Sequence, residues 1–437
     1  MTRSGNSFDA THHDSGASLW AATSPPPPPL VPLAGDAAAD VAVVGAGYTG
    51  LCAAITLADA GRSVVVLDAA EPGHGASGRS GGQVIPGLKD DPEQIEARYG
   101  SDLGPRLVRT VASGPDVVFD LIRRFGIDCQ AVRAGWIQPA HNDATRRLVE
   151  ARARQWHARG APTRVLERDE VAALTGSSLY VGGWFDGRGG TVQPLAYVRG
   201  LGRAAVSLGA RVFRDTPVRA LTHGSAGWLL GTPNGSVRAR RVVLATNACS
   251  GPLHDPLRRS VVAVPSYQVA TRPLPPSLRA QILPGGQAVS DTYNLLRYYR
   301  LDAAGRLVVG ARGQFGRRTG HELLRHHDAA IREIYPQLGT PDYEFRWSGE
   351  VAVTTDHVPH LHDLGDGLYA ALGFNGRGVA MASLLGRLVA NLVLERADPD
   401  GFVYPVTPLS PIPMHAFNQL GVRATISYLR MKDGHWL

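Results

Sequence analysis

Hydrophobic and polar positions follow their most regular pattern in residues 41–68. Four apolar residues, 41–44, come first and lead into a glycine-rich turn. Residues 48–59 then have the composition of a helix that ends at Gly61, and a second strand-like run, 63–67, leads to Asp68. Short apolar runs bounded by glycine turns are typical of buried strands. The pattern therefore predicts a strand, a helix and a second strand parallel to the first.

The turn inside this unit has the glycine spacing of a dinucleotide site. Gly45 permits the tight turn, Gly47 lets the backbone approach a pyrophosphate, and Gly50 lets the helix pack closely on the strand. Phosphates would lie at the helix N-terminus, where free N–H groups and the helix dipole favour negative charge. An acid at the end of the second strand can accept hydrogen bonds from ribose hydroxyls. The predicted contacts are Gly45, Gly47, Tyr48, Thr49, Gly50 and Asp68.

The rest of the chain alternates between helical and strand-like spacing. Helical spacing predicts helices over residues 103–125, 143–159, 167–175, 195–208, 321–335 and 380–394. Strands or extended segments are expected over residues 127–139, 212–221, 227–231, 240–245, 261–272, 295–301, 306–311 and 368–372. Residues 302–305 suit a hairpin turn, and residues 428–433 suit an amphipathic helix. The pattern is that of an α/β protein.

Length and composition limit the number of domains and the class of protein. A chain of 437 residues is too long to fold around a single hydrophobic core, which indicates two domains. No apolar run approaches the roughly 18 residues of a membrane span, and residues 1–14 do not resemble a secretory signal. Cys52, Cys129 and Cys249 lie far apart and match no metal-ligand spacing. We therefore expect a cytoplasmic protein with no metal.

The net charge of +7 is spread along the chain. Lysine occurs only at Lys89 and Lys432, and pairs of arginines stand beside acids or apolar residues. A nucleic-acid surface requires clustered basic residues, so we expect no nucleic-acid partner. Dispersed positive charge near an active site would still attract anionic substrates.

Residues 1–35 are polar and then proline-rich. Five consecutive prolines, residues 25–29, favour a polyproline II segment and exclude a helix. We expect an extended arm over the surface, with Trp20 as its anchor.

A second glycine-rich stretch, residues 73–83, follows Asp68 directly. Its glycines allow the backbone to approach a ligand closely. The two glycine motifs, with the acid between them, resemble the FAD-dependent amine and amino-acid oxidase family, which includes glycine oxidase, sarcosine oxidase and D-amino-acid oxidase. The sequence GASGRSGG is most similar to the γ-glutamylputrescine oxidase-like branch. In that family this loop runs along the FAD, which implies contacts from Gly75, Ala76, Ser77, Arg79, Ser80, Gly81, Gly82 and Gln83.

The resemblance extends over about residues 19–433 and implies a fold. It implies a Rossmann-like FAD-binding domain of the glutathione-reductase type and a second, sheet-rich substrate domain of the D-amino-acid-oxidase type. The expected boundaries are 36–90, 185–254 and 345–437 for the FAD-binding domain, and 91–184 and 255–344 for the substrate domain. Residues 1–35 form the proline-rich arm.

Further contacts to FAD are implied by two later segments. A strand ending in ATNA places Thr246 near the cofactor, and Val218 matches a position whose backbone contacts the adenine side. A strand over residues 368–372 then enters a glycine loop and a helix, which matches the closing FAD segment at the N1–C2 edge of the flavin. The implied contacts there are Gly373, Phe374, Asn375, Gly376, Arg377, Gly378 and Val379.

The chemistry that the family implies is transfer of a hydride equivalent from the carbon beside an amine nitrogen to flavin N5. O2 would then reoxidise the flavin and yield H2O2. Side chains near the reacting atoms are expected to be Gln83, Asn375 and Arg377 around the flavin and Tyr298 and Trp347 on the substrate wall.

Two arginines suit a substrate carboxylate. Either Arg297 or Arg377 could hold that group, or could form a structural pair instead. The face of the strand at Tyr298 and Tyr299 depends on the register, because a slip of one residue exchanges the two faces.

FAD is expected to be noncovalent. Some relatives attach FAD through a late cysteine, but no cysteine follows Cys249. Others use a histidine in the second glycine loop, where this chain has Arg79.

Other classes of protein remain open. A nicotinamide-linked reductase would need a second dinucleotide unit; the only imitation, residues 200–205, lies inside a helical pattern, and no CxxC is present. A flavin monooxygenase, a dehydrogenase with another electron acceptor, and a binding module without activity are the alternatives. The sequence leaves the oligomeric state and the particular amine substrate open.

Overall fold

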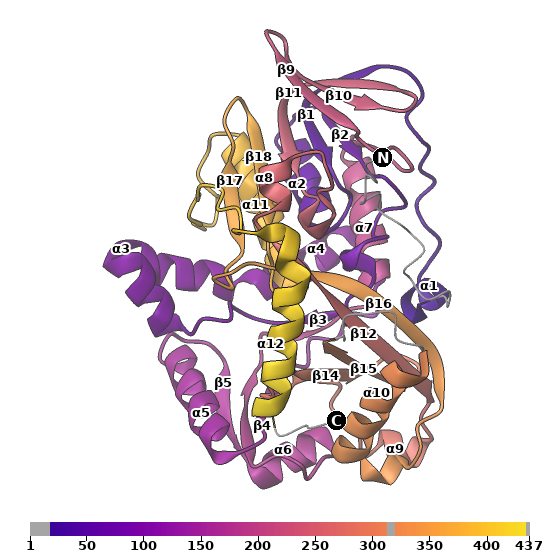
Figure 1. Ribbon diagram of the computed structural model, residues 1–437, viewed down its shortest axis with the longest axis vertical. Coiled ribbons are helices and arrows are strands. Elements are labelled where there is room, and N and C mark those ends of the chain that lie inside the picture. Colours follow the sequence, from indigo (N-terminus) through magenta and orange to yellow (C-terminus); the bar gives the residue numbers. More distant parts are fainter. Residues whose placement is uncertain (1–17, 313–319, 434–437) are drawn as a thin grey trace.

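Two large sheets organise the computed structural model, which describes residues 18–312 and 320–433 (Figure 1). The first sheet, in the upper part of Figure 1, has the strand order β17-β18-β11-β1-β2-β8, with the hairpin of β9 and β10 attached to β11. Its strands are β1 (Ala37–Val44), β2 (Val64–Leu67), β8 (Arg211–Phe213), β9 (Ala220–Gly224), β10 (Gly227–Thr232), β11 (Gly235–Leu244), β17 (His360–Asp363) and β18 (Leu368–Leu372).

The centre of this sheet is parallel, as the βαβ pattern predicted. Strand β1 pairs in parallel with both β2 and β11. All four residues of β2 and the last four of β1 are buried, which suits strands covered on both faces. The helices packed around this sheet are α2 (Tyr48–Asp59), α4 (Gly114–Phe125), α7 (Pro194–Ser207) and α11 (Gly378–Val393).

Close packing of two of these helices requires glycine. A Cβ atom built on Gly386 of α11 would lie 2.4 Å from the carbonyl oxygen of Thr49 and 2.8 Å from Cβ of Cys52. The absence of a side chain therefore lets α11 rest directly on the backbone of α2.

The second sheet, in the lower part of Figure 1, has the order β16-β12-β15-β14-β13-β4-β6-β5. Its pairs are antiparallel except β13 with β4. Its strands are β4 (Trp136–Ala140), β5 (Thr163–Glu167), β6 (Gly182–Asp186), β12 (Val262–Pro273), β13 (Ala288–Ser290), β14 (Arg297–Leu301), β15 (Arg306–Arg312) and β16 (Tyr343–Val353). Helices α3 (Pro92–Ala112), α5 (Asp143–His157), α6 (Arg168–Thr175) and α10 (Gly320–Ile334) accompany it.

The remaining elements lie outside the two large sheets. Strands β3 (Gln83–Val84) and β7 (Gly190–Thr191) form a separate two-stranded ladder. The remaining elements are α1 (Leu19–Thr23), η2 (Ala76–Gly78), η3 (Asn247–Cys249), α8 (Asp255–Arg258), α9 (Pro276–Arg279), η4 (Pro336–Leu338), η5 (His415–Phe417) and α12 (Asn418–Lys432).

Most expected elements are present, but one strand is not. The stretch 212–221 divides into β8 and β9, with an irregular segment between them that includes Val218. The amphipathic helix expected over residues 428–433 is longer and begins at Asn418. At the boundary predicted near residue 345, the whole of β16 pairs with β12 of the second sheet.

Candidate active site

The first glycine turn has the geometry that its sequence predicted. Gly45 has φ +104°, and a Cβ atom on it would lie 2.8 Å from the carbonyl oxygen of Ala245. A Cβ atom on Gly50 would lie 1.9 Å from the carbonyl oxygen of Gly45. Gly47, the N-cap residue of α2, has no side chain with which to cap the helix. The turn therefore brings backbone N–H groups to the carboxyl edge of the sheet, which suits a pyrophosphate.

Asp68 lies at the end of β2, beside this turn. Its carboxylate accepts hydrogen bonds from the backbone N–H groups of Ala46, at 2.6 Å, and Ala70, at 3.0 Å. Burial raises the pKa of Asp68 to about 6. The backbone N–H of Thr216 donates to the Asp68 carbonyl at 2.7 Å, which places the segment containing Val218 at the same edge.

The second glycine loop is held through its carbonyl groups. The Arg79 carbonyl accepts hydrogen bonds from Nε1 of Trp347, at 2.9 Å, and Nε2 of Gln268, at 2.5 Å. The Ser77 carbonyl accepts one from the Tyr48 hydroxyl at 2.6 Å. The backbone N–H of Tyr48, at the start of α2, donates to Oγ of Ser77 at 3.2 Å. The loop thus connects the first glycine turn to β12 and β16 of the second sheet.

Two glycines of this loop pack against other segments: Gly81 contacts β14 of the second sheet, and Gly82 contacts Val192, which follows β7. A Cβ atom on Gly81 would lie 2.8 Å from Cε2 of Tyr298, and one on Gly82 would lie 2.1 Å from the carbonyl oxygen of Val192. The register is therefore decided: Tyr298 faces the glycine loop, whereas Tyr299 faces the other way and donates to the Tyr180 hydroxyl at 3.1 Å.

The amides of Gln83 and Asn375 are occupied by structural contacts. Nε2 of Gln83 donates to the carbonyls of Val289 and Tyr299, and its Oε1 accepts from the Ser290 hydroxyl at 2.8 Å. Oδ1 of Asn375 accepts the Thr354 N–H at 3.0 Å. The side chains of Gln83 and Asn375 therefore fix loops, and the backbone N–H of Asn375 also donates within the protein, to the Ala352 carbonyl at 3.2 Å.

The closing loop joins β18 to α11. Asn375 has φ +53°, and the first N–H of the loop, on Gly373, donates to Oδ1 of Asn247 at 3.0 Å. Asn247 follows Thr246, so the ends of β11 and β18 are tied together. Helix α11 starts after Arg377 without a capping side chain. Its N–H groups and dipole would stabilise negative charge on a reduced flavin.

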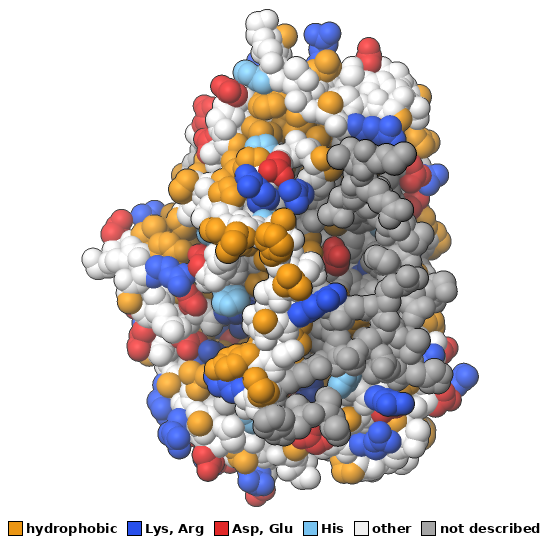
Figure 2. Space-filling view, in the orientation of Figure 1, with side chains coloured by type: hydrophobic (Ala, Val, Ile, Leu, Met, Phe, Trp, Pro, Cys, Tyr) orange, Lys and Arg blue, Asp and Glu red, His pale blue; other side chains and the backbone are white. Residues whose placement is uncertain are grey.

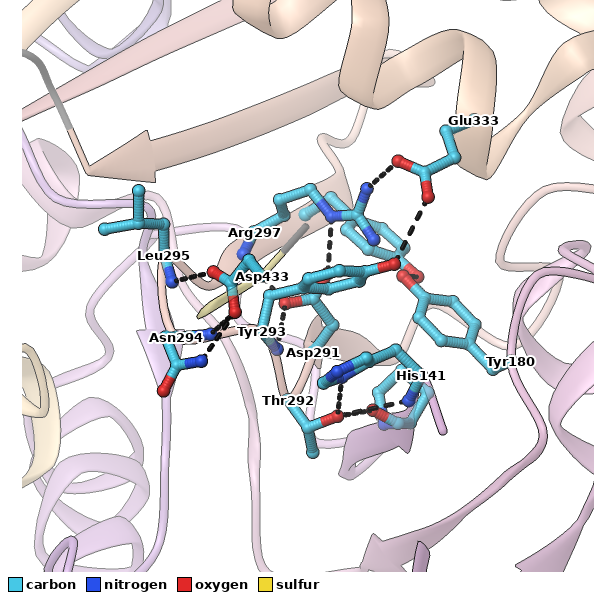
Figure 3. Close-up of polar contacts among 12 residues, drawn as sticks. His141, Tyr180, Asp291, Thr292, Tyr293, Asn294, Leu295, Arg297, Glu333 and Asp433 are labelled. Atoms are coloured by element: carbon cyan, nitrogen blue, oxygen red, sulfur yellow. Dashed lines mark hydrogen bonds and ion pairs between the residues drawn. The ribbon is translucent and has the colours of Figure 1, made fainter. Parts of the chain in front are cut away.

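The two candidate arginines differ sharply. Arg297 is buried and pairs with Asp291 and Glu333, each at 2.6 Å (Figure 3). Of the two roles expected for Arg297, a contact to a substrate carboxylate or a structural ion pair, the structure shows the ion pair. Arg377 donates to the carbonyl of Pro86 at 2.6 Å, and no ion pair is recorded for it in residues 18–312 and 320–433. Burial lowers the pKa of Arg377 to about 9, so it stays charged at neutral pH.

Aromatic and polar groups surround Arg377. Its guanidinium lies 5.7 Å from the ring of Trp136, which packs edge-on against Trp184 at 5.6 Å. Nearby, Arg152 pairs with Asp91 and donates to Oε1 of Gln138 at 2.6 Å. The surroundings of Arg377 thus come from β4 and β6 of the second sheet, from α5 and from the start of α3, whereas Arg377 itself is the N-cap residue of α11.

The sequence pattern did not reveal Trp20 as part of the site. Trp20 is fully buried in α1, and its Nε1 donates to the Ser80 carbonyl at 2.8 Å. Its ring packs edge-on against Trp347, with centroids 5.6 Å apart. The guanidinium of Arg300 lies 5.1 Å from the ring and donates to the carbonyls of Gly82 and Val192. The expected anchor is confirmed, but it inserts behind the glycine loop and does not lie on the surface.

The donor set around the second glycine loop fits a bound flavin. Oε1 of Gln268 and Nε of Arg300 are both buried with no hydrogen-bond partner among the described residues. They lie beside Gly81 and Gly82: a Cβ atom on Gly81 would lie 3.6 Å from Oε1 of Gln268, and Nη1 of Arg300 donates to the Gly82 carbonyl. Polar atoms of this kind are normally satisfied, so a ligand at the loop would complete the site.

A glycine turn, a strand-end carboxylate and two further loops around one sheet edge define a dinucleotide-binding protein. The sequence profile of the DAO family of FAD-dependent oxidoreductases matches residues 40–392. This chain belongs to that family. The prediction of an FAD-dependent oxidoreductase of the amine and amino-acid oxidase type is confirmed.

Similar proteins support this assignment. The chain is 32% identical over 406 residues to γ-glutamylputrescine oxidoreductase of Escherichia coli, a match that covers 92% of this chain and 94% of that protein. It is 32% identical to the probable oxidoreductase OrdL of Haemophilus influenzae, over 82% of this chain and 83% of that one. The structure of glycine oxidase from Geobacillus kaustophilus superposes with a TM-score of 0.71 at 24% identity, over 86% of this chain and 99% of that chain. The expected fold is therefore also confirmed.

Two absences concern the described residues alone. None of their helices is long and apolar enough to cross a membrane. They also contain no group of three or more His, Cys, Asp and Glu residues that could hold a metal ion.

Proposed function

We propose that this enzyme oxidises the C–N bond of a primary or secondary amine to an imine, with noncovalent FAD as the first electron acceptor and O2 as the second. The substrate is an amino acid or a polyamine derivative of the γ-glutamylputrescine kind, and water converts the imine to an aldehyde or oxo acid. The observation that carries the proposal is the position of the second glycine loop, pressed between the dinucleotide turn and the wall formed by Tyr298 and Trp347.

Bound FAD would supply the acceptor for a hydride equivalent from the carbon beside the nitrogen. The start of α2 would hold the pyrophosphate through its backbone N–H groups beyond Tyr48, and the start of α11, which has no capping side chain, would favour negative charge on the reduced ring. Tyr298 and Trp347 would confine the substrate, because they cover the loop from the second sheet. Such confinement orients the reacting carbon and excludes water.

Arg377 is the group best suited to an anionic part of the substrate. It is charged, has no carboxylate partner in the described part of the chain, and lies at the start of α11 between the closing loop and Trp136. A guanidinium can bind a carboxylate through two parallel hydrogen bonds. Substrates that carry a carboxylate at a distance from the amine would satisfy it.

Anaerobic mixing of the holoenzyme with a panel of amines and amino acids tests the reaction. We expect a carboxylate-bearing amine to bleach the flavin absorbance, and admission of O2 to restore it with release of H2O2. Activity should rise with pH, since the substrate amine must lose its proton before hydride transfer. Bleaching by NADPH alone, with no response to any amine, would reject the proposal in favour of a monooxygenase. Reoxidation by a dye but not by O2 would identify a dehydrogenase.

The binding mode has its own tests. Acid precipitation should release free FAD into the supernatant, and flavin retained in the pellet would contradict noncovalent binding. Arg377→Met should raise the KM of a carboxylate-bearing substrate roughly 10- to 150-fold, the equivalent of one charged hydrogen bond of about 1.5–3 kcal/mol. An unchanged KM with a lowered melting temperature would show that Arg377 is structural. The cytoplasm remains the expected location.

A further inference from the structure

The segment from Met414 to Met431 exposes an unusual amount of apolar side chain. Eleven large hydrophobic residues are recorded as exposed in the described part of the chain, and five of them fall in this segment. They are Met414 at 79% exposure, Phe417 at 63%, Leu420 at 60%, Tyr428 at 59% and Met431 at 52%. Figure 2 shows hydrophobic side chains following α12 down the front of the molecule. Contiguous exposed patches of this kind mark interaction sites.

These side chains form a single stripe. Phe417, at the N-cap, and four residues of α12 recur at helical spacing, within about 80° of arc at 3.6 residues per turn. The stripe consists of Phe417, Leu420, Ala424, Tyr428 and Met431, all exposed. We call this set the outer stripe.

The opposite side of α12 already meets the protein. Ile426 is buried, and Val422 and Leu429 are half-buried, at positions roughly half a turn away from the outer stripe. A helix that merely covers a globular protein has one apolar face and one polar face. Helix α12 has apolar residues on both, so its outer stripe is suited to a second apolar surface.

The exposed position of this stripe is fixed by contacts at both ends. Beyond the C-terminus of α12, the Asp433 carboxylate accepts the backbone N–H groups of Asn294, at 3.0 Å, and Leu295, at 2.9 Å (Figure 3). It also accepts the Asn294 side-chain amide at 2.6 Å. Before the N-terminus, the backbone N–H of Ile412 donates to the Arg259 carbonyl at 2.8 Å. The outer stripe is therefore presented on a helix held across the molecule.

The charges beside the outer stripe indicate which kind of partner surface it binds. The sequence from residue 401 to residue 432 contains no Asp or Glu but has Arg423, Arg430 and Lys432. Arg423 and Lys432 are exposed, and their helical positions lie on opposite flanks of the outer stripe. A second copy of this chain would bring two such basic helices together, which like-charge repulsion disfavours. An anionic lipid surface complements both the apolar stripe and its basic flanks.

We propose that α12 is an interfacial helix that docks this enzyme on an anionic lipid surface. Phe417, Leu420, Tyr428 and Met431 enter the headgroup boundary, while Arg423 and Lys432 contact lipid phosphates. This role is peripheral and does not require a membrane-spanning segment. It is independent of the reaction, since no residue of the outer stripe belongs to the flavin site described above.

Sedimentation of the full-length holoenzyme with lipid vesicles tests the proposal. We expect binding to vesicles of phosphatidylcholine mixed with phosphatidylglycerol, little binding to phosphatidylcholine alone, and weakening by salt. The double variant Leu420→Glu/Tyr428→Glu should lose at least roughly ten-fold in affinity, because it removes two buried apolar contacts and adds negative charge.

A matched control is available elsewhere on the surface. Leu148 on α5 and Val206 on α7 are also exposed apolar residues on helices, at 49% and 44%. Leu148→Glu/Val206→Glu makes the same change in charge and should bind vesicles almost as the parent does. Flavin absorbance and melting temperature should be unchanged in both variants, which separates docking from folding.

Several results would overturn the proposal. Absence of binding to anionic vesicles is one, and equal loss of binding in the control variant is another, because the net charge alone would then explain it. Dimerisation in light scattering that disappears in Leu420→Glu/Tyr428→Glu would assign the outer stripe to a second copy. Binding of that variant equal to the parent's would show that another surface meets the lipid.

Discussion

Replacement of Trp20 tests whether the segment before the proline run belongs to the flavin site. Nε1 of Trp20 donates to the Ser80 carbonyl in the second glycine loop at 2.8 Å, and the indole packs edge-on against Trp347. Trp20→Phe keeps most of the buried ring and deletes the donor. Trp228→Phe is the matched control, because Nε1 of Trp228, in β10, makes an equivalent bond of 2.8 Å to the carbonyl of Asp366, in the turn between β17 and β18.

The expected magnitude follows from burial. Trp20 is fully buried, so loss of its N–H leaves the Ser80 carbonyl short of a partner at a cost of about 1–3 kcal/mol. If this loss is confined to the loop conformation that binds FAD, the Kd for FAD rises roughly 5- to 150-fold. Trp20→Ala also opens a cavity and should cost about 3–5 kcal/mol in the free energy of unfolding. Trp228 is partly exposed, so water can replace its lost bond.

Fluorescence titration of the apoprotein with FAD measures the first effect, and urea unfolding of the apoprotein measures the second. We expect Trp20→Phe to weaken FAD binding and Trp228→Phe to leave it within about two-fold, which is under 0.5 kcal/mol. Equal FAD affinity in Trp20→Phe and the parent would refute the reasoning. It would show that the loop keeps its conformation without this segment.

Three further predictions concern single side chains. Gly50→Ala places a Cβ atom 1.9 Å from a backbone oxygen and should destabilise the apoprotein by about 2 kcal/mol, whereas Gly202→Ala, with its nearest neighbour at 3.7 Å, should be neutral or slightly stabilising in the same urea unfolding experiment. Burial raises the pKa of Asp68 to about 6, so its contribution to stability is present below pH 4 and is lost as the pH rises through 6. Asp68→Asn cannot ionise, so the apoprotein of this variant should lose less stability than the parent between pH 4 and pH 7; parallel curves would contradict this. Arg297→Ala leaves Asp291 buried without its partner and should cost about 3–5 kcal/mol in unfolding with KM unchanged. A raised KM without loss of stability would return Arg297 to the substrate site.

The sequence determined the parts of this protein that depend on local backbone geometry. The turn at Gly45 needs a positive φ, and Gly50 must lack a side chain, so their spacing predicts the dinucleotide unit directly. The same holds for the strand and loop that precede α11, whose bounds differ from the predicted ones by only a residue or two. Periodicity over a few residues is enough to specify such elements.

Side-chain partners were decided by the tertiary structure. Gln83 bonds to strands more than 200 residues away, and Nε and Nη1 of Arg297 bond to Asp291 and Glu333, so both side chains are held by distant parts of the protein. Trp20 reaches Ser80, 60 residues later, through a turn of helix that the proline-rich composition of the arm concealed.

The two faces of α12 show most clearly why the sequence predicts a helix but not which side of it is buried. Its sequence gives an apolar position almost every turn on both sides, and periodicity alone does not distinguish the side that packs on the protein from the side that remains exposed. The contacts of Asp433 with Asn294 and Leu295 fix the end of the helix against the second sheet and leave the outer stripe exposed. Local spacing specifies that a helix forms, whereas contacts between distant segments decide which of its faces meets the rest of the protein.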